Sequence, residues 1–184
     1  MNANESGPAT EPRPGDLLLF THARGLNRLI TWFTRSRFYH VGIYQGEAHV
    51  VEARPRGVVR RDLRGGEGEA YFAVIPAPEG KGMEALRWAE AHIGASYDVA
   101  NVLVLVLDRC LECVNLRYSS GNRFACGELV VRAYRAAGVN LFPHCAPESV
   151  VPAHFESMLP AGAKIESFPP NQTRPTVVPS KLAS

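Results

Sequence analysis

The chain has 184 residues, of which 46% are hydrophobic and 21% charged. These values suit one globular domain with tails and exclude a globally disordered protein. The 20 Lys and Arg against 18 Asp and Glu leave a net charge of +2, which gives no reason to expect a nucleic-acid-binding protein. Four cysteines are too few for a disulfide scaffold.

The N-terminal residues 1–14 are polar and Pro-containing, which predicts a flexible arm. They show no basic start followed by an apolar run, so we expect neither a signal peptide nor an anchor, and we predict a cytoplasmic location. The most apolar stretch, Val99–Leu107, is shorter than the ~20 residues that span a bilayer. It predicts a buried helix. The alternative is an acyl-chain pocket or a lid that makes peripheral contact with a membrane.

The segment 15–76 has the pattern of short β-strands. Its apolar runs are rich in β-branched and aromatic residues, and Gly, Pro or charged residues separate them. Between the first two runs, residues 26–33 have the pattern of a short amphipathic helix. The expected strands are Asp16–Phe20, His40–Tyr44, Ala48–Ala53, Gly57–Arg60 and Tyr71–Ile75.

After the break at residues 76–82 the pattern becomes helical, with apolar residues three and four positions apart. Gly94 and Gly138 are placed to end the first and third of three expected helices. The first expected helix has an apolar side formed by Met83, Leu86, Ala89 and Ile93. The second is expected at residues 100–111 and the third at residues 126–137. The expected domain covers residues 15–160, followed by a Pro-rich tail at 161–184.

The hairpin around Gln45-Gly46-Glu47 brings a histidine close to a carboxylate. If these residues form a three-residue loop, Tyr44 pairs with Ala48 and His40 lies directly opposite Glu52. A carboxylate in that place can orient the imidazole and stabilise its charged form. The alternative is an ordinary polar cross-strand pair, and a one-residue slip would separate the two side chains.

Cys126 stands at the expected N-terminus of the third helix. The helix dipole and the free backbone N–H groups there lower the pKa of a thiol, and they can also receive an oxyanion that forms beside the sulfur. Gly127 is expected to leave room for the backbone of a substrate. The alternative is a buried structural cysteine at the start of a core helix.

Four segments in order, Pro14–Phe20, Tyr39–Tyr44, Val51–Ala53 and Phe124–Leu129, resemble the NlpC/P60 superfamily of papain-like cysteine hydrolases. The cysteine helix follows the strands, as in the circularly permuted branch (YiiX/YaeF-like and lecithin:retinol acyltransferase-like). The resemblance implies an α+β fold, with an antiparallel β-sheet or barrel packed against helices. It also implies that Cys126 is the nucleophile, His40 the general base and acid, and Glu52 the third member of the triad.

The resemblance further implies acyl transfer from an amide, ester or thioester through a thioester acyl-enzyme, without a metal or organic cofactor. The substrate would be a small molecule, a peptide or peptidoglycan-type amide, or a lipid ester. Gly94–Tyr97 resembles a family segment whose tyrosine hydroxyl helps to shape the oxyanion or substrate site, which assigns that part to Tyr97.

Other interpretations stay open at this point. Cys110 and Cys113 form a C-x-x-C pair that could bind zinc with Cys126, Cys145 or His144, form a disulfide, or be two ordinary cysteines. The arginine run Arg54–Arg64 favours a solvated hairpin, with an anion-binding surface as the alternative. A zinc-stabilised binding module and a lipid-binding domain without catalysis therefore remain alternatives to the hydrolase. The sequence does not predict the oligomeric state.

Overall fold

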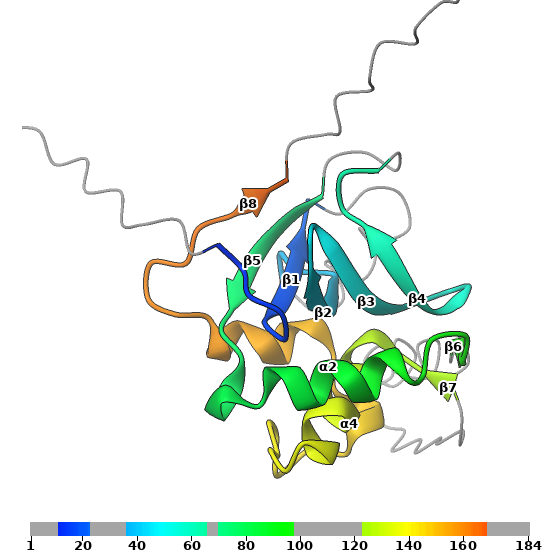
Figure 1. Ribbon diagram of the computed structural model, residues 1–184. Helices are drawn as coiled ribbons and strands as arrows, with labels where there is room; N and C mark the ends of the chain where they lie inside the picture. The colour runs from blue at the N-terminus through cyan, green and yellow to red at the C-terminus, as the bar shows by residue number, and fades with distance from the viewer. Residues whose placement is uncertain (1–10, 23–35, 66–69, 98–122, 169–184) are drawn as a thin grey trace, which may run out of the picture.

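The structure, a computed structural model, describes residues 11–22, 36–65, 70–97 and 123–168. Within these ranges the chain forms a six-stranded antiparallel sheet with the strand order β4-β3-β2-β1-β5-β8 (Figure 1). The strands are β1 (Leu17–Thr21), β2 (His40–Gly46), β3 (His49–Arg54), β4 (Gly57–Asp62), β5 (Tyr71–Ile75) and β8 (Glu166–Ser167). The expected α+β class is confirmed.

Helices α2 (Gly82–Glu90) and α4 (Cys126–Ala136) pack against each other below the sheet in Figure 1. Beside them, β6 (Ser96–Tyr97) and β7 (Arg123–Phe124) form a short parallel pair that leads into α4. The remaining elements are the 3-10 helices η1 (Pro78–Gly80), η2 (Pro147–Ser149) and η3 (Pro152–Met158). No helix of the described residues combines the length and the apolar character needed to cross a bilayer.

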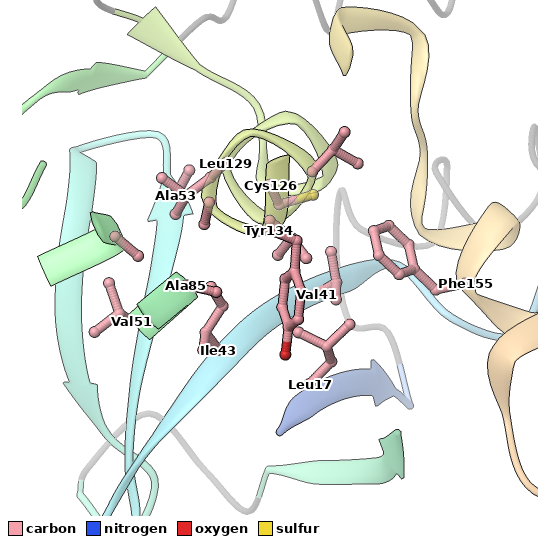
Figure 2. Packing of buried hydrophobic residues seen from close by; sticks show 14 of the residues in the cluster. Leu17, Val41, Ile43, Val51, Ala53, Ala85, Cys126, Leu129, Tyr134 and Phe155 are labelled. Carbon is pink, nitrogen blue, oxygen red and sulfur yellow. The ribbon is translucent and has the colours of Figure 1, made fainter. Parts of the chain in front are cut away.

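The main core lies between the sheet and the two helices (Figure 2). Alternate side chains of the strands point into it, such as Leu17, Val41 and Val51, and they meet Ala85 of α2 and Leu129 of α4. All five are fully buried. Burial of apolar area of this kind is the main favourable term in folding, and here it fixes α4 against β2.

The side chains on the opposite face of the strands form a second core, which includes Leu18, Phe20 and Phe72. Both faces of β1 are therefore buried, which explains its unbroken apolar sequence. Phe168, just after β8, closes this second core with ring centroids 5.8 Å from Tyr44 and 5.4 Å from Phe72. The expected domain end at residue 160 is therefore too early, because part of the expected tail 161–184 is a strand of the sheet.

All five expected strands are present, with bounds within two residues of the prediction. The third helix ends as predicted, since Gly138 has a positive φ of 90°. The apolar side expected for the first helix is partly wrong, because Met83 and Ile93 are 45% and 46% exposed. Met83 lies in the first turn, and Ile93 comes after the helix has ended at Glu90. The helices expected at 26–33 and 100–111, and the apolar stretch Val99–Leu107, lie outside the described residues.

Candidate active site

The hairpin of β2 and β3 has a tighter turn than expected. Glu47 and Ala48 form a two-residue turn and have positive φ angles of 49° and 61°, as a type I′ hairpin requires. Gly46 pairs with His49 across this turn, and a β-bulge between Tyr44 and Gly46 then shifts the register by one residue, so that Tyr44 pairs with Val50. The expected three-residue loop and Tyr44–Ala48 pairing are therefore wrong. Ala48 instead lies in the turn, where its N–H donates to the Tyr44 hydroxyl at 3.1 Å.

This register moves His40 and Glu52 from directly opposite to diagonal positions, but it leaves them on the same face, because the shift is by two residues. The expected contact is present, with His40 Nε2 2.9 Å from Glu52 Oε2. Continuing the register places Gly42 opposite Glu52, where a Cβ atom would come within 3.1 Å of the Glu52 Cβ. The missing side chain at Gly42 therefore leaves space for Glu52 beside His40.

Glu52 is fully buried, and an arginine that the sequence analysis did not assign to the site holds it. Arg61 of β4 places Nε 2.5 Å from Oε1 and Nη2 3.1 Å from Oε2. Arg54 adds a longer ion pair, with Nε 3.6 Å from Oε1. The solvated hairpin expected for the arginine run is thus wrong for Arg61, whose diagonal position to Glu52 follows from the pairing of Glu52 with Val59.

Cys126 is the first residue of α4, and Figure 2 shows its sulfur at the start of that helix. The His40 side chain and the backbone N–H groups of Val41 and Gly127 lie close enough to the sulfur to lower the pKa of the Cys126 thiol. Because His40 Nε2 faces Glu52, Nδ1 is the ring nitrogen left for the sulfur. The structure therefore brings Cys126, His40 and Glu52 together in one chain of contacts.

Burial disfavours the charged forms of Cys126, His40 and Glu52, but the interactions among these groups and their neighbours favour the charged forms more strongly. Burial lowers the pKa of His40, yet the charges of Glu52 and Cys126 raise that pKa to about 9. Burial raises the pKa of Glu52, yet the charge of His40 and the hydrogen bonds from His40 and Arg61 lower it to about 2. The pKa of the Cys126 thiol is likewise lowered against burial, by His40 and by two backbone N–H groups. These directions favour a thiolate–imidazolium pair beside an ionised carboxylate.

Glu128 stabilises the start of α4. Its Oε2 accepts the Ala125 N–H at 3.4 Å, and its Oε1 pairs with Arg132 at 2.8 Å. The bond from Ala125 is the half of a capping box in which the third helical residue accepts the N–H of the N-cap residue, and Ala125 has no polar side chain to accept the N–H of Glu128 in return. Burial raises the pKa of Glu128.

The space beside Gly127 is occupied by the chain itself. A Cβ at this position would lie 2.2 Å from the backbone oxygen of Val150. The expectation that Gly127 leaves room for a substrate backbone is therefore corrected: the glycine allows the segment after η2 to pack on α4. Its backbone N–H still contacts the sulfur of Cys126.

The backbone of Tyr97 in β6 pairs with that of Phe124 in β7, two residues before Cys126. The long sequence gap between Tyr97 and Cys126 thus closes in space at the level of the backbone. This placement keeps Tyr97 next to the strand that leads into the cysteine helix.

Cys110 and Cys113 lie outside the described residues. Across the ranges that the structure describes, no three His, Cys, Asp or Glu side chains are grouped so as to hold a metal ion. Cys126, a candidate ligand in the zinc alternative, lies beside His40.

In the comparisons with known proteins, no protein-family model and no curated protein matches the chain.

Proposed function

We propose that this protein is a cysteine hydrolase or acyltransferase that acts on an amide, ester or thioester bond. The observation that carries the proposal is the contact chain from the Cys126 sulfur through the His40 imidazole to the buried Glu52 carboxylate. A nucleophile, a base and a group that orients the base are the parts that acyl transfer requires. The order of sheet strands and cysteine helix supports a circularly permuted papain-like fold of the NlpC/P60 type.

In the proposed reaction, the Cys126 thiolate attacks the carbonyl carbon of the substrate and its π electrons move to the oxygen. The resulting oxyanion is stabilised by the helix N-terminus, with the backbone N–H of Cys126 as the proposed donor. The oxyanion then collapses, and His40 gives its proton to the leaving amine, alcohol or thiol as the C–N, C–O or C–S bond breaks. Water or another acceptor, deprotonated by His40, releases the acyl group from sulfur.

The substrate class that we propose is a peptide or peptidoglycan-type amide, or a lipid ester. A panel of amide, ester and thioester substrates, assayed with wild-type protein and Cys126→Ala, tests the proposal. We expect turnover of at least one bond type, and its loss in Cys126→Ala but not in Cys145→Ala. Turnover that persists in Cys126→Ala would contradict the proposal.

A thiol reagent gives a test that needs no substrate. We expect iodoacetamide to label Cys126 faster than Cys110, Cys113 and Cys145, and we expect His40→Ala to slow that labelling. Equal rates at all four cysteines would remove the chemical basis of the proposal. Two other results would favour the alternatives: stoichiometric zinc in the purified protein, or fatty acyl lipid bound without turnover and unchanged in Cys126→Ala.

A further inference from the structure

We propose that Arg61 is a positioning residue of the site, which fixes the Glu52 carboxylate against His40 and balances its charge. This inference deepens the proposed function, and its meaning for catalysis rests on that function. It starts from the two hydrogen bonds that Arg61 makes to both oxygens of Glu52.

The geometry leaves Glu52 little freedom. Oε2 contacts His40 Nε2 at 2.9 Å and Arg61 Nη2 at 3.1 Å, while Oε1 contacts Arg61 Nε at 2.5 Å. A planar guanidinium that binds both oxygens fixes the plane of the carboxylate as well as its position. The orientation of the imidazole toward Cys126 therefore depends on Arg61 through Glu52.

Phe20 also contacts the guanidinium, with Arg61 Cζ over its ring. Its ring lies 5.0 Å from the Arg61 Cζ atom and 5.6 Å from the centroid of the His40 ring. Phe20 is also the direct cross-strand partner of His40 and is 1% exposed. Arg61 and His40 thus share one buried aromatic surface, which restricts the motion of both.

Arg61 supplies the less exposed of the two positive charges that offset the inner cluster of Cys126, His40 and Glu52. The charged groups around Glu52 are His40 from β2, Arg61 from β4 and the more exposed Arg54, while Cys126 from α4 faces His40. Thiolate, imidazolium, carboxylate and the Arg61 guanidinium sum to zero. Without Arg61, the inner cluster of Cys126, His40 and Glu52 has a net negative charge, so every proton on it binds more tightly.

The test is the pH dependence of Cys126 alkylation by iodoacetamide, resolved by peptide mass spectrometry, from pH 4 to pH 10 in steps of about half a unit. For Arg61→Met we expect the acid limb of the profile to move up by about one pH unit, which is about a tenfold fall in rate on that limb. Arg61→Lys keeps the positive charge but loses the planar guanidinium that binds both oxygens of Glu52. We therefore expect the acid limb to stay at the same pH and the maximal rate to fall. Arg60→Met is the matched control, since Arg60 is the preceding residue on β4 and is exposed; its profile should equal that of the wild type.

A folded Arg61→Met with an unchanged acid limb would overturn the inference. If Arg61→Met does not fold, Arg61→Lys decides: a maximal rate equal to the wild-type value overturns the inference, and a lower one at an unchanged limb supports it. Alkylation is independent of any substrate. Labelling that depends on Arg61, without turnover on the substrate panel, would therefore contradict the proposed function and leave the positioning role intact. Turnover on the panel with no effect of Arg61 on labelling would support the proposed function and contradict the positioning role.

Discussion

Glu52 is suited to hold a charge and not to exchange a proton. Its pKa of about 2 lies far below the neutral range, and its two oxygens already face His40 and Arg61. A buried carboxylate without such partners would cost several kcal/mol and would take up a proton instead. In the proposed reaction, this environment supports a role for Glu52 in orienting the imidazole and stabilising its positive charge, and His40 is the group that moves protons.

Glu52→Gln tests that role at the level of one atom. A glutamine has no charge and only one acceptor oxygen for the two donor groups. Its NH₂ group must therefore face either His40 or Arg61. We expect the pKa of His40 to fall from about 9 toward its ordinary value, and alkylation of Cys126 near pH 7 to slow about tenfold or more. NMR titration of the imidazole measures the first change. A His40 pKa that stays near 9 would show that Glu52 is not its source.

The dependence of stability on pH reports the Cys126–His40 pair. Raising the pKa of His40 to about 9 stabilises the fold fully below its unfolded value of 6.5, and this contribution is lost as the pH rises through 9. The lowered pKa of Cys126 changes stability with the opposite sign. Its contribution is full above the unfolded value of 9.0 and decreases as the pH falls below that value. Between these limits the native pair and the unfolded pair each bind one proton, so their joint contribution to stability is nearly constant.

Cys126→Ala should therefore expose the His40 contribution. We expect its free energy of unfolding to fall by about 1 kcal/mol per pH unit as the pH rises above 6.5, relative to the nearly constant contribution in the wild type. Urea denaturation at pH 6 to 9 measures both curves, with Cys145→Ala as the control. Parallel curves for Cys126→Ala and wild type would indicate a neutral Cys126–His40 pair.

At the scale of elements, the β2–β3 hairpin places two side chains of the site, and Gly42 makes their contact possible. A Cβ at Gly42 would lie 2.6 Å from Val50 Cγ2 and 3.1 Å from the Glu52 Cβ. We expect Gly42→Ala to lower the free energy of unfolding by about 1–3 kcal/mol and to slow Cys126 alkylation by displacing Glu52.

Gly65→Ala is the matched control for that change, because the nearest atom to a Cβ there is 3.7 Å away. Thermal unfolding followed by circular dichroism, together with the alkylation rate, gives both readouts. Gly42→Ala with the stability and labelling rate of Gly65→Ala would mean that the hairpin accommodates the methyl group without moving Glu52.

Much of this hairpin is predictable from sequence, and the errors in the prediction have physical causes. Period-two patterning identifies β2 and β3 and places His40 and Glu52 on one face, which a register error of two residues preserves. The turn itself was misassigned, because Glu47 and Ala48 are not residues that usually adopt a positive φ. Arg61 was missed because its role depends on the pairing of a third strand, which a run of arginines does not reveal.

At the scale of the whole molecule, the site lies where the start of the cysteine helix meets the central strands of the sheet. The two parts are far apart in the sequence, so the folded body must hold α4 against β2 for Cys126 to reach His40. The Tyr134 hydroxyl of α4 donates to the Gly15 carbonyl at 2.7 Å, and the Gly15 N–H donates to the Tyr44 carbonyl of β2 at 2.7 Å, which links the two elements. Sequence patterns locate the helix and the strand, but packing between them brings sulfur and imidazole together.

The C-terminal strand β8 contributes to that body, and Phe168 is the side chain that tests it. The ring stacks on Tyr44 and lies tilted against Phe72, and the Arg64 guanidinium lies 5.7 Å from its centroid. We expect Phe168→Ala to lower the free energy of unfolding by about 1–3 kcal/mol, and Phe168→Leu to lower it less, because leucine keeps part of the apolar contact.

Urea denaturation of Phe168→Ala, Phe168→Leu and the exposed-site control Met83→Ala measures this contribution. The alkylation rate of Cys126 in the folded Phe168 variants should equal the wild-type rate, because Phe168 packs on the second core and not on the groups that contact the sulfur. If Phe168→Ala unfolds at the same urea concentration as Met83→Ala, the Phe168 ring adds no stability to the second core.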